Sequence, residues 1–126
     1  MRNPVDAPPA SYTESGTWPD GPLTADAPPT AHAGQALARS LRALMRARSL
    51  SARALAARTG TTHPTVRRIL TGAGLVDVRT VFLLEVALQA PLWPADLYAD
   101  FHRRKGTSGA SSAAATPAVD EGQRRD

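Results

Sequence analysis

Two adjacent arginines, Arg67 and Arg68, stand in the middle of TGTTHPTVRRILTG, residues 59–72. An arginine guanidinium carries a planar fork of donors that matches the O6 and N7 acceptors of guanine. One bidentate pair of this kind discriminates between bases by roughly 1–3 kcal/mol. His63 and Pro64 each precede one of these arginines by four residues, which places all four on one helix face within about one turn. This spacing suits contact with a nucleic acid.

The proline in this stretch predicts the start of a helix rather than a break in one. The first turn of a helix tolerates proline because its N–H groups have no intrahelical partner. We expect Thr62 to cap this helix and Gly72 to end it. Its apolar positions, Val66, Ile69 and Leu70, then face inward. The histidine, the proline and the two arginines remain on the outer side.

Four further helices are predicted between residues 34 and 105, because apolar residues recur there at helical spacing. The first covers residues 34–49. The second begins at its cap Ser51 and ends at Gly60. The fourth of the five follows its cap Asp77 over residues 78–89, with an apolar stripe of Val78, Val81, Leu84 and Leu88. The last covers residues 94–104. No segment shows strand alternation, so the predicted fold is all-α with five helices.

The charge of the chain is concentrated in its middle. The net charge is +4 overall, but residues 34–105 hold twelve basic and four acidic side chains, whereas both ends are weakly acidic. A basic middle favours a polyanionic partner; a solvated arginine-rich surface is the alternative. Four arginines are expected to supply general positive field and solubility, namely Arg42, Arg46, Arg48 and Arg58.

The two ends differ in composition from the middle. Residues 1–33 contain seven of the eleven prolines and no apolar periodicity, and residues 106–126 are of low complexity. Both are predicted to be disordered, which leaves residues 34–105 as the folded domain. The chain has no cysteine. It also has no run of 18 apolar residues, the length that would predict a membrane-spanning helix. We expect a cytoplasmic, nucleoid-associated protein.

Enzymatic chemistry finds no support in the sequence. His32, His63 and His102 lie far apart in the sequence, and no carboxylate cluster accompanies them. We therefore expect no catalytic, metal-binding or cofactor-binding residues. The folded segment also has no room for a separate ligand-sensing domain, so any signal would act through a partner protein, the flexible ends or protein concentration.

The two central helices and their glycine-containing turn have the pattern of a helix-turn-helix unit, whose second helix enters the major groove of DNA. The sequence resembles the phage repressor and Cro-like family, also called the xenobiotic-response-element (XRE) family. The motifs are Leu50–Ser51, Leu55–Ala56, Gly60, TVRRI at residues 65–69, Gly72, and the leucines and alanine that end at Leu88.

This resemblance implies a compact five-helix, lambda-repressor-like domain in a sequence-specific transcriptional regulator that binds double-stranded DNA, usually as a homodimer. By position, it assigns base contacts to His63, Pro64, Arg67 and Arg68. It assigns phosphate contacts to the starts of the second and third helices, at Ser51, Ala52, Arg53, Thr62 and Thr65, and to Arg79 after the third helix.

The sequence departs from the family pattern at three places. Ala52 stands where many members have a glutamine that clamps a phosphate. Met45 and Leu70 replace an arginine and a glutamate that pair with each other; exchanging a buried ion pair for packed apolar side chains is often neutral or stabilising. Pro64 replaces a residue able to hydrogen-bond a base, but it retains apolar contact, for instance with a thymine methyl group.

A second hypothesis is that the same fold serves as a protein-interaction module, as in an antitoxin or adaptor, with weak or no DNA binding. An unidentified regulatory protein would then be the partner. Several apolar residues could form such a surface, a homodimer interface or part of the core: Leu75, Val76, Trp93, Leu97, Tyr98 and Phe101.

Overall fold

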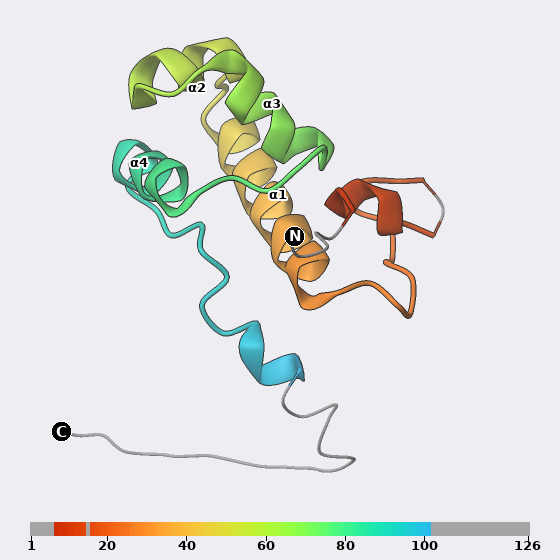
Figure 1. Ribbon diagram of the computed structural model, residues 1–126. Helices are drawn as coiled ribbons and strands as arrows, with labels where there is room; N and C mark the ends of the chain where they lie inside the picture. Colours follow the sequence, from red (N-terminus) through yellow and green to blue (C-terminus); the bar gives the residue numbers. More distant parts are fainter. Residues whose placement is uncertain (1–6, 15, 102–126) are drawn as a thin grey trace, which may run out of the picture. The chain divides into compact units, whose positions relative to one another are not determined.

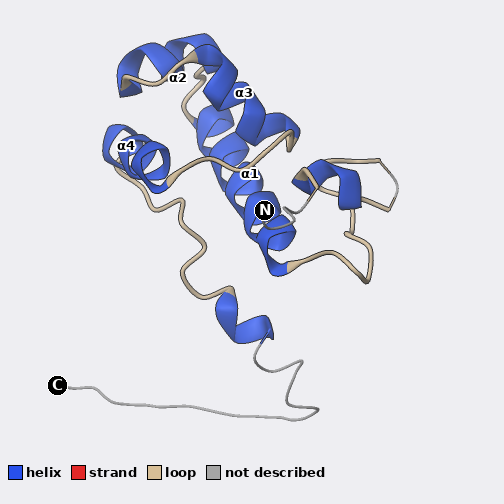
Figure 2. Cartoon of the chain, viewed as in Figure 1, coloured by secondary structure: helices blue, strands red, loops and turns tan. Residues whose placement is uncertain are grey.

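The structure is a computed structural model that describes residues 7–14 and 16–101. Its elements are a short 3-10 helix, η1 (Pro9–Tyr12), and the α-helices α1 (Pro29–Ala47), α2 (Ala52–Thr59), α3 (His63–Thr71) and α4 (Val78–Leu88) (Figure 1). Residues 98–101 are also helical. The described part of the chain contains no strand beyond a single β-bridge (Figure 2). The prediction of an all-α fold is confirmed.

Side-chain caps and glycines define the helix ends where the sequence predicts them. Ser51 Oγ accepts from Ala54 N at 3.1 Å, and Thr62 Oγ1 accepts from Thr65 N at 3.2 Å. Asp77 Oδ1 likewise accepts from Thr80 N at 2.9 Å. Each cap binds an N–H group that would otherwise lack a partner in the first turn. Gly60 and Gly72 then end α2 and α3 with φ values of 75° and 70°.

One core joins the four α-helices of residues 7–94. Its largest fully buried side chains are Leu41 of α1, Leu55 of α2, Val66 of α3, and Leu84 and Leu88 of α4. Met45 is buried in this core, and Leu70 is half-buried against it. Apolar packing therefore occupies both positions at which the sequence departs from the family's ion pair.

The prediction that Val78 belongs to the buried apolar stripe of α4 is wrong. Val81, Leu84 and Leu88 are buried as expected, but Val78 is 74% exposed. Successive residues of a helix are rotated by about 100° around its axis, so the three buried side chains lie within an arc of roughly 60°. Val78 lies about 60° outside that arc, on the side of Val81. Thr80, one of the few buried polar residues, occupies the other side of the buried face.

The expectation that residues 1–33 are disordered is wrong for the residues of that range that the structure describes. α1 begins at Pro29, and residues 7–28 (without residue 15), here called the N-terminal segment, fold back against α1 and α3. Pro9, Pro19 and Gly21 are buried within it. Residues 102–126, which include the predicted disordered tail and the end of the predicted last helix, lie outside the described residues.

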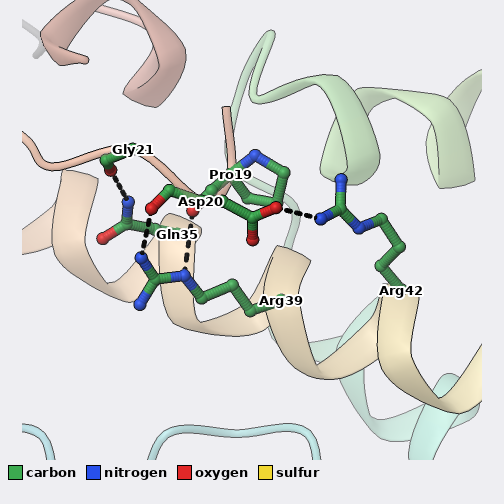
Figure 3. A network of polar contacts seen from close by, with 6 residues as sticks. All are labelled: Pro19, Asp20, Gly21, Gln35, Arg39 and Arg42. Carbon is green, nitrogen blue, oxygen red and sulfur yellow. Dashed lines mark hydrogen bonds and ion pairs between the residues drawn. The ribbon is translucent and has the colours of Figure 1, made fainter. Parts of the chain in front are cut away.

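Polar side chains along one face of α1 hold this segment (Figure 3). Gln35 Nε2 donates to Gly21 O at 2.7 Å, and Arg39 donates to the carbonyls of Pro19 and Asp20 at 2.9 and 3.0 Å. Arg42 forms an ion pair with the Asp20 carboxylate. Because proline has no N–H group, a proline-rich segment has fewer backbone donors than acceptors, and Gln35 and Arg39 bind three of its carbonyl groups.

Two glycines give the same segment room to pack. A Cβ at Gly72 would lie 2.5 Å from Trp18 Cε2, and a Cβ at Gly34 would lie 2.9 Å from Pro9 Cγ. Ala10 N also donates to Gly72 O at 3.0 Å. The segment therefore contacts both the first half of α1 and the end of α3.

Residues 95–101 belong to a separate compact unit. Ala99 N donates to Asp96 O at 3.1 Å and Asp100 N donates to Leu97 O at 3.0 Å, and residues 98–101 form a helical turn. None of the described helices is long and apolar enough to cross a membrane.

Candidate nucleic-acid interface

α2 and α3 are joined by a short turn that fixes their relative orientation. Gly60 adopts the left-handed conformation, which costs little in the absence of a Cβ. The buried Thr59 hydroxyl lies 2.8 Å from the Thr61 hydroxyl and within 3.4 Å of Thr61 N. On the inner side, Leu55 of α2 and Val66 of α3 are fully buried in one core. The two helices therefore present a defined outer surface.

α3 separates its apolar and polar residues as the sequence predicts. Val66 and Ile69 are buried, whereas Pro64, Arg67 and Arg68 are exposed. His63 is half-buried at the first position of the helix. The outer face thus carries the two guanidinium groups together with the proline, and the histidine lies at its N-terminal edge.

Arg68 has room to extend because a glycine lies beneath it. A Cβ at Gly74 would approach Arg68 Cδ to 3.1 Å and its Cγ to 3.5 Å. The aliphatic part of Arg68 thus passes over the loop after α3 while its charged group stays exposed. Arg67 and Arg68 have no acidic partner among residues 7–14 and 16–101.

The helix starts have the hydroxyl and N–H groups that suit an anion. Ser51, Thr62 and Arg53 are exposed, and Thr65 is half-buried. The Thr62 and Thr65 hydroxyls are 2.8 Å apart. The first main-chain hydrogen bond of α2 is donated by Leu55 N to Ser51 O at 2.9 Å. The N–H groups of the two residues after Ser51 therefore have no intrahelical acceptor and suit an anion.

The remaining two predicted phosphate positions differ in their surroundings. Ala52 is half-buried and packs against the core, so it offers only its backbone. Arg79 is exposed in the first turn of α4.

Seven of the nine arginines that the structure describes fall into two groups. Residues 51–76 contain four arginines and no acidic residue, and those four are exposed. By contrast, Arg39 and Arg42 are bound by the N-terminal segment, and Arg48 donates to Leu88 O at the end of α4. Arg42 and Arg48, which were expected to contribute to the general positive field, thus also have specific partners within the domain. Four of the six described arginines without such a partner lie on α2 and α3, and the other two are Arg46 of α1 and Arg79 of α4.

Comparison with known families bears on this geometry. Residues 36–92 match the family model of a helix-turn-helix domain. The matched residues include α2, α3 and the turn between them, the two-helix unit for which that family is named. The family is associated with XRE-like DNA-binding proteins, as the sequence resemblance implies. No curated protein and no solved structure matches the chain.

The helix-turn-helix domain supports a DNA-binding regulator in general, and its family is typically non-enzymatic. Among the residues that the structure describes, no group of three or more His, Asp or Glu side chains could hold a metal ion.

The sequence analysis did not predict the role of Glu85, whose carboxylate binds backbone N–H groups after α4. Glu85 Oε2 accepts from Leu92 N at 2.7 Å and Trp93 N at 2.8 Å. These two hydrogen bonds hold the pKa of Glu85 below its usual range, and the bond from Trp93 N has the larger effect. The Thr80 side chain and then its backbone N–H similarly lower the pKa of Asp77. The order of the N-terminal segment could have been inferred from one pattern in the sequence. The polar residues Gln35, Arg39 and Arg42 recur on one face of α1, which indicates that this face binds polar groups.

Proposed function

We propose that this protein is a sequence-specific transcriptional regulator that inserts α3 into the DNA major groove. The observation that carries the proposal is the exposed pair Arg67 and Arg68, unpaired with acidic groups in the described structure, on the second helix of a helix-turn-helix domain. A recognition helix of this kind places its N-terminal residues against base edges. The guanidinium fork then recognises guanine.

The contacts divide into two kinds. His63, Pro64, Arg67 and Arg68 contact bases, and their order along α3 sets the order in which base pairs are read. Phosphates are bound at the helix starts and after α3, by Ser51, Ala52, Arg53, Thr62, Thr65 and Arg79. Ala52 contributes its N–H rather than a side chain, and the Ser51 hydroxyl remains a donor because its cap contact uses the oxygen as acceptor.

The decisive experiment is selection of bound DNA from genomic fragments at near-physiological salt, followed by sequencing. The wild-type chain is expected to recover a recurring motif, and the Arg67→Ala/Arg68→Ala variant is expected to lose it. The matched control is Arg39→Ala/Arg42→Ala, which removes the same charge from side chains held by the N-terminal segment. This control is expected to recover the wild-type motif, provided circular dichroism shows that it is folded. Failure of the folded wild-type chain to recover any motif would contradict the proposal.

Single variants test the division into base and phosphate contacts. Arg68→Ala is expected to relax sequence preference at one position. Arg53→Ala is expected to weaken all sites alike and to reduce the slope of log affinity against log salt by about one. The two variants are compared by binding titrations over a series of salt concentrations on matched and mismatched sites. Identical behaviour of the two variants would contradict the division.

The second candidate function is a protein-interaction module with weak or no DNA binding. It is favoured by the exposure of Leu75 and Trp93, whereas Val76 is half-buried against the core. In the separate unit, Tyr98 is exposed, and Leu97 and Phe101 are half-buried. Stable co-purification with one protein, together with weak DNA binding that does not depend on sequence, would favour this candidate over the regulator.

A further inference from the structure

Gly74, in the loop between α3 and α4, lies beside the side chain of Arg68. If Gly74 carried a Cβ, the three nearest heavy atoms would all belong to Arg68: Cδ at 3.1 Å, and Cγ and Nε at 3.5 Å each. The contact therefore follows the Arg68 side chain from its aliphatic part to the first nitrogen of its guanidinium group.

The space beside Gly74, rather than its backbone conformation, is what favours glycine at this position. Positive φ values occur at Gly16, Gly60 and Gly72 but not at Gly74, so the left-handed region does not exclude an alanine here. A Cβ at 3.1 Å from Arg68 Cδ, however, would lie inside the ordinary carbon–carbon contact distance of about 3.5–4.0 Å. An alanine at residue 74 would therefore displace the arginine side chain and leave the loop in place.

The contact with Gly74 directs Arg68 across the loop that follows α3. Successive residues of a helix are rotated by about 100° around its axis, so Arg67 and Arg68 leave α3 in different directions. The guanidinium of Arg68 stays exposed at the end of its packed aliphatic part. No ion pair with an acidic side chain of residues 7–14 and 16–101 competes for this direction.

The direction of an arginine matters for reading a base as much as its charge does. A guanidinium that donates two hydrogen bonds to one guanine has to be held in one orientation. Arginine is also among the side chains that lose most rotamer freedom when they are fixed. Contact over three atoms of Arg68 sets part of this orientation before DNA binds, which lowers the entropic cost of binding.

We propose that Gly74 is a positioning residue, which directs Arg68 to the base pair that it reads. This inference deepens the proposed function and rests on it, because it takes Arg68 as a base contact. Gly74 acts only through Arg68, by leaving room for its side chain. Arg67 leaves α3 in another direction and reads a separate base pair.

The first test measures the Arg68 side chain by nuclear magnetic resonance of the full chain, labelled with nitrogen-15, in the absence of DNA. The Nε–H signals of Arg67 and Arg68 are assigned by their loss in Arg67→Ala and Arg68→Ala. In Gly74→Ala, the heteronuclear NOE of Arg68 Nε–H is expected to fall, because the side chain loses its packing, whereas that of Arg67 stays the same. An unchanged NOE of Arg68 overturns the inference.

The second test measures base preference on the motif that the wild-type chain recovers. Each base pair is exchanged in turn, and binding is titrated for wild type, Arg68→Ala and Gly74→Ala. Gly74→Ala is expected to lose at least about fivefold in preference at the base pair where Arg68→Ala loses it, since a bidentate arginine–guanine pair discriminates by at least that factor. Preference at the other base pairs is expected to stay. A merely structural role would weaken all sites alike, so a uniform loss or an unchanged preference overturns the inference.

The matched control is the Gly74→Ala/Arg68→Ala chain, which carries the same added methyl group with no arginine side chain to displace. Its base preference is expected to equal that of Arg68→Ala alone, because two residues that act through one contact are not additive. A further loss of preference in the double variant would show that Gly74 does not act through Arg68. Circular dichroism confirms that each variant is folded before its binding is compared.

Together the two tests separate this inference from the proposed function. A folded wild-type chain that recovers no motif contradicts the regulator, and with it the base pair as the target of Arg68, whatever the resonance measurement shows. A wild-type chain that recovers a motif which Gly74→Ala reads unchanged contradicts the inference alone and leaves the regulator standing.

Discussion

Replacement of Gly72 by alanine tests whether the N-terminal segment is part of the fold. Gly72 has φ of 70°, and a Cβ there would lie 2.5 Å from Trp18 Cε2 and 2.7 Å from Ala10 Cβ. The left-handed conformation costs an alanine about 1–2 kcal/mol. Overpacking against the indole ring and Ala10 adds about 1–3 kcal/mol. We expect Gly72→Ala to lower the free energy of unfolding by about 2–5 kcal/mol.

Gly60 provides a matched control within the same domain. It also ends a helix, with φ of 75°, but a Cβ at Gly60 would meet no heavy atom within 4 Å. Gly60→Ala therefore incurs only the conformational cost of about 1–2 kcal/mol. The difference between the two variants measures the packing of the N-terminal segment alone.

Urea unfolding followed by far-ultraviolet circular dichroism measures both variants, with the unfolding slope as a check that the transition remains two-state. In a Trp18→Ala background, the additional cost of Gly72→Ala is expected to fall toward that of Gly60→Ala, since the closest clash is absent. Equal losses for Gly60→Ala and Gly72→Ala in the otherwise wild-type chain would refute the reasoning, because they would show that nothing packs against Gly72.

Three further predictions concern the edges of the domain. Trp18 Nε1 is buried without a hydrogen-bond partner among the described residues, and an unpaired buried donor costs about 1–3 kcal/mol; in urea unfolding we therefore expect Trp18→Phe to be within about 1 kcal/mol of wild type, whereas Trp18→Ala loses about 2–4 kcal/mol. Equal losses for the two would show that the indole N–H is satisfied. The Arg42–Asp20 ion pair is partly exposed, with 34% and 60% of the two side chains accessible, so Asp20→Asn is expected to cost under about 1 kcal/mol at low salt and less in 1 M NaCl; a larger loss that is insensitive to salt would contradict this. Glu85 has a lowered pKa in the folded state, so its stabilising contribution is complete above about pH 4.3 and is lost as the pH falls through the native pKa. Stability measured between pH 3 and 7 is expected to depend less on acid in Glu85→Gln, and an unchanged acid dependence would contradict the role of the Leu92 and Trp93 N–H groups.

The sequence alone determined the local features of the helix-turn-helix. Ser51, Thr62 and Asp77 bind N–H groups three residues away, and Gly60 and Gly72 adopt a conformation that other residues disfavour. These effects depend on neighbours within one turn, so residue type and spacing suffice to predict them. The inward position of Val66 and Ile69 follows equally from helical period. The assignment of base and phosphate contacts stays a prediction, because it depends on DNA.

Features that depend on partners far along the chain become visible only in the tertiary structure. The N-terminal segment has no apolar periodicity of its own, and its order comes from bonds to Arg39 and Arg42, about 20 residues away. Arg48 reaches the end of α4 across 40 residues. Val78 shares the residue type of the buried Val81, yet it faces outward. Composition and period describe what a residue can bury or bind, whereas the approach of other elements determines which of those contacts it makes.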